Sequence, residues 1–159
     1  MALHSYDVVI VGAGCAGMTA AIYARRAGKT ALLLEAENFG GQISVSPLVE
    51  NFPSVRAISG AEFSDNLLRQ AIDLGAHAEL ETVTCVEKTK SGFLVNTEYT
   101  QYDAKAIILA TGLKHRRIGL SGEDGFVGRG LSYCAVCDGA FFADRPVAVV
   151  GGGNTALQD

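Results

Sequence analysis

Apolar and polar positions in the first part of the chain change from a strand pattern to a helix pattern and back. Residues 6–11 form a continuous apolar run rich in β-branched side chains, typical of a buried parallel strand. An alanine-rich stretch over 18–27 then ends at Gly28, a common helix terminator. Residues 30–34 are a second short apolar run, followed by Glu35. This order predicts a βαβ unit.

The middle of the chain begins with a segment that has no periodicity, 36–52, which we expect to be a long functional loop. Ser59 and Glu62 then form a capping box, and apolar side chains recur at helical spacing until Gly75. Beyond this helix the pattern predicts short strands. The predicted strands are 78–81, 83–87, 93–97 and 99–102, and a further buried strand is predicted over 106–110.

The last part of the chain is less regular. Residues 112–130 are rich in glycine and basic side chains and predict a linker. The apolar run 146–150 predicts a buried strand that begins a second βα unit. The chain ends at Asp159, a few residues into the helix that should follow, so we expect it to be part of a longer protein.

Composition argues against several classes of protein. The chain has 159 residues, of which 48% are hydrophobic and 19% charged, enough for the core of one ordinary domain. The net charge is -4 and no basic block occurs, so we expect neither a nucleic-acid partner nor a membrane surface. The apolar runs are far shorter than the ~20 residues of a membrane span, and no secretory signal precedes the first strand. We therefore expect a cytoplasmic protein.

A glycine-rich sequence separates the first predicted strand from the first predicted helix. Gly12 permits a tight turn, Gly14 lets backbone N–H groups approach a pyrophosphate, and Gly17 lets helix and strand pack closely. At the end of the next strand, the Glu35 carboxylate can accept both hydroxyls of an adenosine ribose. An ordinary turn is the alternative, but the complete context indicates dinucleotide binding. The carboxylate would repel a 2′-phosphate, which favours FAD or NAD over NADP.

A second glycine motif, G-x-G-x-x-A, occupies 151–156 directly after the apolar run 146–150. A generic βα turn is its alternative interpretation. Two dinucleotide units on one chain are the arrangement used to pass a hydride from a nicotinamide to a flavin. We therefore predict an α/β, Rossmann-like fold with three layers (ββα), forming the N-terminal part of a flavoprotein with two dinucleotide domains.

A pair of cysteines, Cys134 and Cys137, is followed by Asp138. A structural zinc site needs four ligands, and no histidine has ligand spacing to this pair, so we expect no metal. Two inert buried thiols are a further alternative. The spacing places both sulfurs on one helical turn within disulfide reach, which favours a redox pair. Asp138 could move the proton that thiol–disulfide exchange requires, or it could be a plain acid in the first helical turn.

Together and in this order, these motifs resemble those of bacterial low-molecular-weight thioredoxin reductases over the whole chain. The resemblance implies that Cys137 faces the flavin, that Cys134 attacks the partner disulfide, and that Asp138 manages the proton. The residues implied to bind FAD are Gly12, Ala13, Gly14, Cys15, Ala16, Gly17, Glu35, Ala36, Gly40, Gly41, Gln42, Asn51, Val83, Ala110, Thr111 and Gly112. Those implied to bind NADPH or NADH are Gly151, Gly153, Asn154, Thr155 and Ala156.

The resemblance also implies a domain layout and an activity. Residues 1–113 would be the N-terminal part of a FAD-binding domain, and 114–159 a linker, the redox pair and the start of a truncated NAD(P)H-binding domain. Electrons would pass from NAD(P)H through FAD to the disulfide, and on to thioredoxin or a similar small disulfide protein. We expect a homodimer for the full-length protein and no activity for this segment alone.

Two other functions remain open at this point. A related flavin-dependent reductase or oxidase could use another donor, such as ferredoxin, or a small dithiol as its substrate. A flavin-binding module with a structural dithiol would have no enzymatic activity. Thiol titration with and without oxidant separates the redox and structural interpretations of the cysteine pair.

Overall fold

The computed structural model describes residues 4–158, except for the side chains of 155 and 158. These residues form two compact units. The first comprises the described residues up to 46 together with 59–112, and the second comprises 47–58 with the described residues from 113 onward. Within the part of the chain that is described, no helix is long and apolar enough to cross a membrane.

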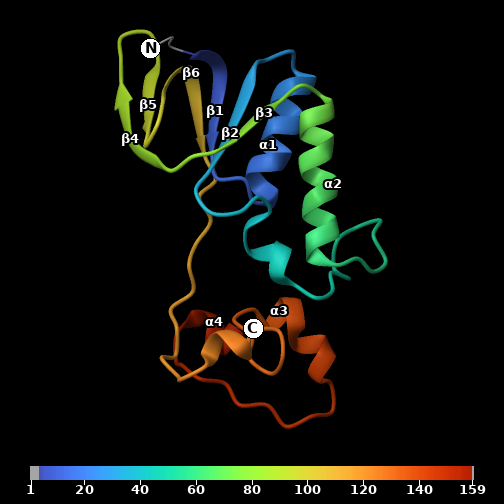
Figure 1. Ribbon diagram of the computed structural model, residues 1–159. Helices are drawn as coiled ribbons and strands as arrows, with labels where there is room; N and C mark the ends of the chain where they lie inside the picture. The colour runs from blue at the N-terminus through green and yellow to red at the C-terminus, as the bar shows by residue number, and fades with distance from the viewer. Residues whose placement is uncertain (1–3, 159) are drawn as a thin grey trace. The chain divides into compact units, whose positions relative to one another are not determined.

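The first unit is built on a six-stranded sheet with strand order β3-β2-β1-β6-β5-β4. Its strands are β1 (His4–Val11), β2 (Ala31–Glu35), β3 (His77–Leu80), β4 (Val83–Lys88), β5 (Phe93–Thr97) and β6 (Gln101–Leu109). The first three strands and β6 pair in parallel, whereas β4, β5 and β6 pair antiparallel. Helices α1 (Cys15–Arg26) and α2 (Gly60–Asp73) lie over one face of the sheet (Figure 1). The predicted βαβ unit is confirmed as β1, α1 and β2.

Two apolar clusters form the core of this unit, one on each face of the parallel strands. The cluster on the helix side consists of Ile10, Ala13, Met18, Ala21, Ile22, Leu33, Ala71 and Ala76. The cluster on the other face consists of Val9, Leu32, Leu34, Val95, Tyr102 and Ala104. Successive residues of β1 and β2 enter opposite clusters, which explains their continuous apolar sequences. One mixed sheet with helices on one of its faces confirms the predicted α/β fold.

Most residues of the two predicted strands 99–102 and 106–110 belong to the single strand β6, which spans Gln101–Leu109. Residue 99 lies in the turn before it, where the Thr97 hydroxyl accepts a hydrogen bond from the Thr100 N–H at 2.9 Å. The polar residues at 103 and 105 interrupt the apolar pattern but not the backbone pairing with β1. The expected burial of 106–110 is also wrong, because Leu109 is 72% exposed.

The strand predicted over 146–150, at the start of the second βα unit, is absent. No described strand pairs with the segment, and its valines Val147, Val149 and Val150 are 69%, 68% and 70% exposed. An apolar run becomes a strand only when a neighbouring backbone accepts and donates its hydrogen bonds. A glycine turn and the short helix α4 (Asn154–Gln158) follow, as expected.

The remaining elements are short. The 3-10 turn η1 (Gly41–Val45) belongs to the first unit, and the second unit contains η2 (Glu123–Gly125), α3 (Ala135–Asp138) and η3 (Gly139–Phe142). Isolated bridges join Val49 to Ile58 and Val127 to Leu131 within the second unit. The predicted linker over 112–130 therefore contains ordered turns.

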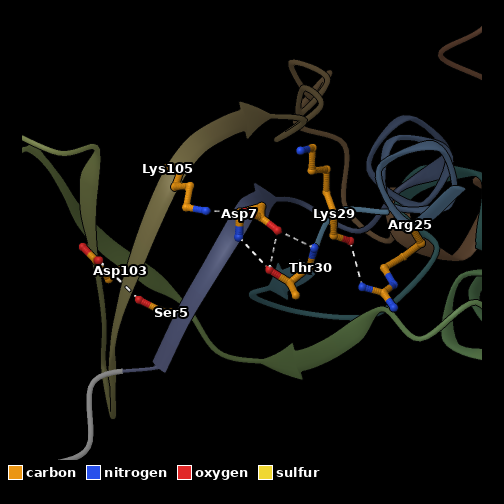
Figure 2. A network of polar contacts seen from close by, with 7 residues as sticks. All are labelled: Ser5, Asp7, Arg25, Lys29, Thr30, Asp103 and Lys105. Carbon is orange, nitrogen blue, oxygen red and sulfur yellow. Dashed lines mark hydrogen bonds and ion pairs between the residues drawn. The ribbon is translucent and has the colours of Figure 1, made fainter. Parts of the chain in front are cut away.

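A polar network centred on Asp7 joins β1, β6 and the residue before β2 (Figure 2). The Asp7 carboxylate accepts hydrogen bonds from the Thr30 N–H at 2.8 Å and the Thr30 hydroxyl at 3.0 Å. The Lys105 ammonium lies 2.7 Å from the same carboxylate. Lys105 and the Thr30 groups hold the pKa of Asp7 well below its ordinary value. The network fixes neighbouring strands through side chains that the hydrophobic pattern does not reveal.

Candidate functional sites

The glycine loop between β1 and α1 contains two glycines that the fold itself requires. Gly12 has a φ of 100°, and a Cβ there would lie 2.3 Å from the carbonyl oxygen of Ala110. A Cβ on Gly17 would lie 1.9 Å from the carbonyl oxygen of Gly12. These contacts confirm the tight turn and close helix packing expected from the sequence.

Gly14 differs from those two glycines, because the protein does not fill the space beside it. Its φ is -76°, which any residue can adopt, and the nearest atom to an added Cβ is the Gly40 oxygen at 3.9 Å. Gly14 is the N-cap of α1, and no side chain caps this helix or places an acid in its first turn. Open backbone at an uncapped helix N-terminus fits the pyrophosphate of a dinucleotide.

Three separate stretches that the sequence predicted to bind FAD meet at the carboxyl ends of the parallel strands. The Gly40 N–H donates to the Ala13 carbonyl oxygen at 2.8 Å, and Gly14 forms a bridge with Gly40. The Ala110 N–H donates to the Val11 carbonyl oxygen at 2.8 Å. The fold thus brings the glycine loop, the segment at 40–41 and the end of β6 together.

Glu35 lies at the end of β2 and binds the backbone around it. Its Oε2 accepts a hydrogen bond from the Ala13 N–H at 2.8 Å. Its Oε1 accepts from the N–H groups of Ala36 at 2.9 Å and Glu37 at 3.0 Å. The carboxylate therefore holds the glycine loop against the end of β2, a contact that the sequence did not indicate. Its expected contact with a ribose stays a prediction.

The other predicted FAD residues are more dispersed. Cys15 begins α1 half-buried, and burial raises the pKa of its thiol. Val83 begins β4 and packs against the apolar cluster on the second face. Asn51 belongs to the second unit and is exposed. The remaining residues, Ala16, Gln42, Thr111 and Gly112, are exposed on the first unit.

Cys134 and Cys137 form a disulfide with their Cα atoms 5.2 Å apart, as predicted. Cys134 is the N-cap of α3, and its Sγ lies 3.2 Å from the Cys137 N–H, which donates to it. Both cysteines therefore lie on one helical turn. The other two cysteines are free, and Cys85 is exposed on β4.

Ser132 is a polar partner of the dithiol that sequence reasoning missed. Its Oγ donates to Asp138 Oδ2 at 2.5 Å and accepts from the Cys134 N–H at 3.0 Å. A serine two residues before a helix N-cap commonly bonds nearby backbone, and this local signal could have found it. Ser132 and Asp138 also line a pocket of about 300 Å³. Its other lining residues are Pro47, Leu48, Gly128, Leu131, Phe141 and Phe142.

A buried acid, Glu123, organises the segment that leads to the dithiol. It is 4% exposed and accepts hydrogen bonds from the N–H groups of residues 118, 119 and 120 at 3.0, 2.8 and 3.0 Å. The Tyr133 hydroxyl also donates to it, and the Tyr133 ring stacks on His115. Desolvation opposes ionisation, but these N–H groups and Arg117 outweigh it and lower the pKa of Glu123. The sequence of this segment predicted a linker, and no pattern in it indicated that Glu123 is buried.

The second glycine motif forms a turn into α4. Gly151 has a φ of 130°, and a Cβ there would lie 3.7 Å from the Cβ of Ala156. Gly153 is exposed, Asn154 begins the helix, and the Thr155 side chain lies outside the described residues. Over residues 4–158, no three His, Cys, Asp or Glu side chains are grouped to hold a metal ion.

Comparison with known proteins gives the family. A family model described as pyridine nucleotide-disulphide oxidoreductase matches residues 6–158. The chain belongs to this family. It is 46% identical over 155 residues to a thioredoxin reductase of Treponema pallidum, covering 97% of this chain and 50% of that protein. It is 42% identical over 154 residues to one of Bacillus subtilis, with 97% and 49% covered.

Comparison with solved structures finds the same kind of protein as the sequence comparison. The crystal structure of thioredoxin reductase from Streptococcus pyogenes matches with a TM-score of 0.92 and 40% identity, covering 98% of this chain and 51% of that one. The resemblance to bacterial thioredoxin reductases inferred from the motifs is therefore confirmed. The chain spans about half the length of these three relatives.

Proposed function

We propose that the protein carrying this chain is a thioredoxin reductase, in which electrons pass from NAD(P)H through FAD to the Cys134–Cys137 disulfide and then to thioredoxin. The observation that carries the proposal is the disulfide on the first turn of α3, with Asp138 as the next residue. It occurs in a chain whose glycine loop leaves an open cradle beside Gly14. An oxidisable dithiol and a dinucleotide cradle are the two parts that such electron transfer needs.

The residues around the cradle fit FAD. The uncapped N-terminus of α1 would hold the pyrophosphate, and Glu35 would accept hydrogen bonds from the adenosine ribose. When bound, FAD supplies a carrier that accepts a hydride and delivers two electrons to a disulfide. We also propose that FAD contacts the other residues implied by the resemblance, which are Gly40, Gly41, Gln42, Asn51, Val83, Ala110, Thr111 and Gly112.

The reduced dithiol can transfer its electrons by two exchange steps. The Cys134 thiolate attacks a partner disulfide, forming a mixed disulfide and releasing one partner thiolate. The Cys137 thiolate then attacks Cys134, which restores the Cys134–Cys137 disulfide and releases the second partner thiolate. Each released thiolate takes one proton, and Asp138 is the adjacent group able to supply it. The Cys137 N–H, directed at Cys134 Sγ, would stabilise negative charge on the attacking sulfur.

The nicotinamide cofactor, NADPH or NADH, is proposed to bind at the turn 151–156. The full-length protein is proposed to be a cytoplasmic homodimer. The glycine turn and α4 support this assignment. The domain assignment, with 1–113 in a FAD-binding domain and 114–159 leading into the NAD(P)H-binding domain, belongs to the same proposal.

Absorption and turnover test the proposed function. The purified full-length protein that carries this chain should show a flavin spectrum, and it should oxidise NADPH or NADH when oxidised bacterial thioredoxin is added. Cys134→Ser and Cys137→Ser should each abolish thioredoxin reduction and leave the flavin spectrum in place. Cys85→Ser, at the exposed free cysteine, is the matched control and should retain full activity. Absence of bound flavin, or full activity of either dithiol variant, would contradict the proposal.

A further inference from the structure

The side chain of Ser132 joins the backbone of Cys134 to the carboxylate of Asp138. Its Oγ lies 2.5 Å from Asp138 Oδ2, 3.0 Å from the Cys134 nitrogen and 3.1 Å from the Cys134 carbonyl oxygen. We propose that Ser132 is a positioning residue that holds Asp138 for proton transfer during thiol–disulfide exchange. The inference rests on the proposed function, because it assigns Asp138 as the proton donor.

The hydroxyl of Ser132 carries one proton and has two acceptors within reach. When Asp138 is ionised, the proton is directed to the carboxylate, because hydrogen bonds to charged groups are the stronger ones. When Asp138 is protonated, its own O–H can donate to Ser132 Oγ, and the serine proton can turn to the Cys134 carbonyl oxygen at 3.1 Å. Both protonation states are thus hydrogen-bonded without movement of heavy atoms.

The surroundings of Asp138 make this serine the side chain that orients it. Among the eight residues lining the pocket beside it, Ser132 and Asp138 are the two with polar side chains. The Asp138 N–H is already bonded to the Cys134 carbonyl oxygen at 3.1 Å, which fixes its backbone. The side chain still has its own rotations, and the bond from Ser132 selects one of them.

Proton transfer from Asp138 accompanies the first exchange step, in which Cys134 attacks the partner disulfide. The S–S bond of the partner breaks as Cys134 attacks and a Cys134–partner S–S bond forms. The partner thiolate leaves with the electron pair, and the Asp138 carboxylic acid gives it a proton that Asp138 has taken from solvent. A misplaced acid would slow this transfer without preventing attack by the thiolate. The effect of Ser132 should therefore depend on how much the leaving thiolate needs a proton.

The experiment measures single-turnover exchange between the prereduced protein and two small disulfides, as well as oxidised thioredoxin. Bis(2-hydroxyethyl) disulfide releases a basic alkyl thiolate that needs a proton, whereas 5,5′-dithiobis(2-nitrobenzoate) releases a stable aromatic thiolate that does not. With the alkyl disulfide we expect Ser132→Ala to slow exchange about tenfold and Asp138→Asn about a hundredfold. With the aromatic disulfide both variants should stay within about twofold of wild type, since leaving-group protonation is not needed.

A double variant shows whether Ser132 acts through Asp138. Ser132→Ala combined with Asp138→Asn should be no slower than Asp138→Asn alone. Ser132→Thr should retain the wild-type rate, whereas Ser132→Val, which has the shape of the threonine variant without its hydroxyl, should match Ser132→Ala. The Thr and Val pair also provides the comparison if Ser132→Ala does not fold.

Three outcomes would overturn the inference. They are an unchanged rate in Ser132→Ala and Ser132→Val, a multiplicative loss in the double variant, or equal losses with the alkyl and aromatic disulfides. A different outcome would count against the proposed function alone. In that case the protein fails to reduce thioredoxin, but the Ser132 and Asp138 variants still lose their rate of exchange with the alkyl disulfide in the expected, non-multiplicative way.

Discussion

The carboxylate of Glu35 accepts a hydrogen bond from the backbone N–H of Ala13, with the two atoms 2.8 Å apart. One acid thus fixes the glycine loop against the end of β2. The same carboxylate is proposed to bind the ribose of FAD, so it would shape the cradle and contact the cofactor. Removing it should affect both the loop and the affinity.

Glu35→Ala should weaken FAD binding by about ten- to a hundredfold, because a hydrogen bond to a charged group contributes roughly 1.5–3 kcal/mol. Titration of the apoprotein with FAD, followed by flavin fluorescence, measures the change. Glu98→Ala is the matched control, since Glu98 is an exposed acid in the turn before β6. Unchanged affinity in Glu35→Ala would show that Glu35 is a structural acid alone.

Alanine substitutions at Gly14 and Gly17 should separate binding from folding. Gly17→Ala places a Cβ 1.9 Å from a carbonyl oxygen, so it should reduce the free energy of unfolding by about 1–3 kcal/mol or more. Gly14→Ala meets no atom closer than 3.9 Å, so it should leave the unfolding free energy within about 1 kcal/mol of wild type. It should still lower FAD affinity at least about tenfold, because the Cβ occupies the open cradle. Urea unfolding of the apoproteins and FAD titration give the two values, and normal FAD binding by Gly14→Ala would contradict a pyrophosphate site there.

Glu123 should make the segment before the dithiol sensitive to acid. The pKa of Glu123 is lowered in the folded protein, so its contribution is complete above its ordinary pKa of 4.5 and is lost as pH falls through the folded value. Proteolysis between residues 117 and 133 should therefore accelerate as the pH falls below 4.5. Glu123→Gln should show faster cleavage already at pH 7, whereas Asp124→Asn, at the exposed neighbouring acid, should resemble wild type. An acid-tolerant protease such as pepsin, with mass spectrometry of the fragments, covers the lower pH range.

Asp7 should produce a pH-dependent stability in the first unit. The pKa of Asp7 lies below its ordinary value of 3.8 because of Lys105 and the two Thr30 groups, so the carboxylate stabilises the fold above that pH. This stabilisation disappears as pH falls through the folded pKa. The urea midpoint of Asp7→Asn should be below that of wild type at pH 7, and the two should converge on acidification. Asp103→Asn removes a half-buried acid of β6 whose carboxylate accepts a hydrogen bond from the Ser5 hydroxyl at 3.3 Å, and it should change the midpoint little. A constant gap between wild type and Asp7→Asn at all pH values would refute the ionic explanation.

The sequence predicted well wherever the chemistry is local. Gly12, Gly14 and Gly17 lie close together in the sequence, and their spacing between two predicted strands and a helix indicated the loop that the fold contains. The two residues between Cys134 and Cys137 likewise indicated a disulfide on one helical turn. Such features depend on short stretches of backbone, which local pattern describes.

The sequence predicted poorly wherever partners come from other parts of the chain. Lys105 and Asp7 are separated by 98 positions, and no spacing rule connects them. Glu123 is buried because a turn directs three N–H groups toward it, and neither the turn nor the burial has a pattern in a glycine-rich segment. The run 146–150 has the composition of a strand, but composition does not supply the neighbouring strand.

The place of β1 in the sheet sets the order in which this unit can fold during synthesis. His4 pairs with Tyr102 and Val11 with Leu109, so β1 gains its second neighbour only after nearly the whole unit has left the ribosome. Until then one edge of an apolar strand stays open to pairing with other chains. Such distant pairing slows folding, because a long loop must close before the contact is made. Nascent chains released before β6 should therefore depend strongly on chaperones to avoid aggregation.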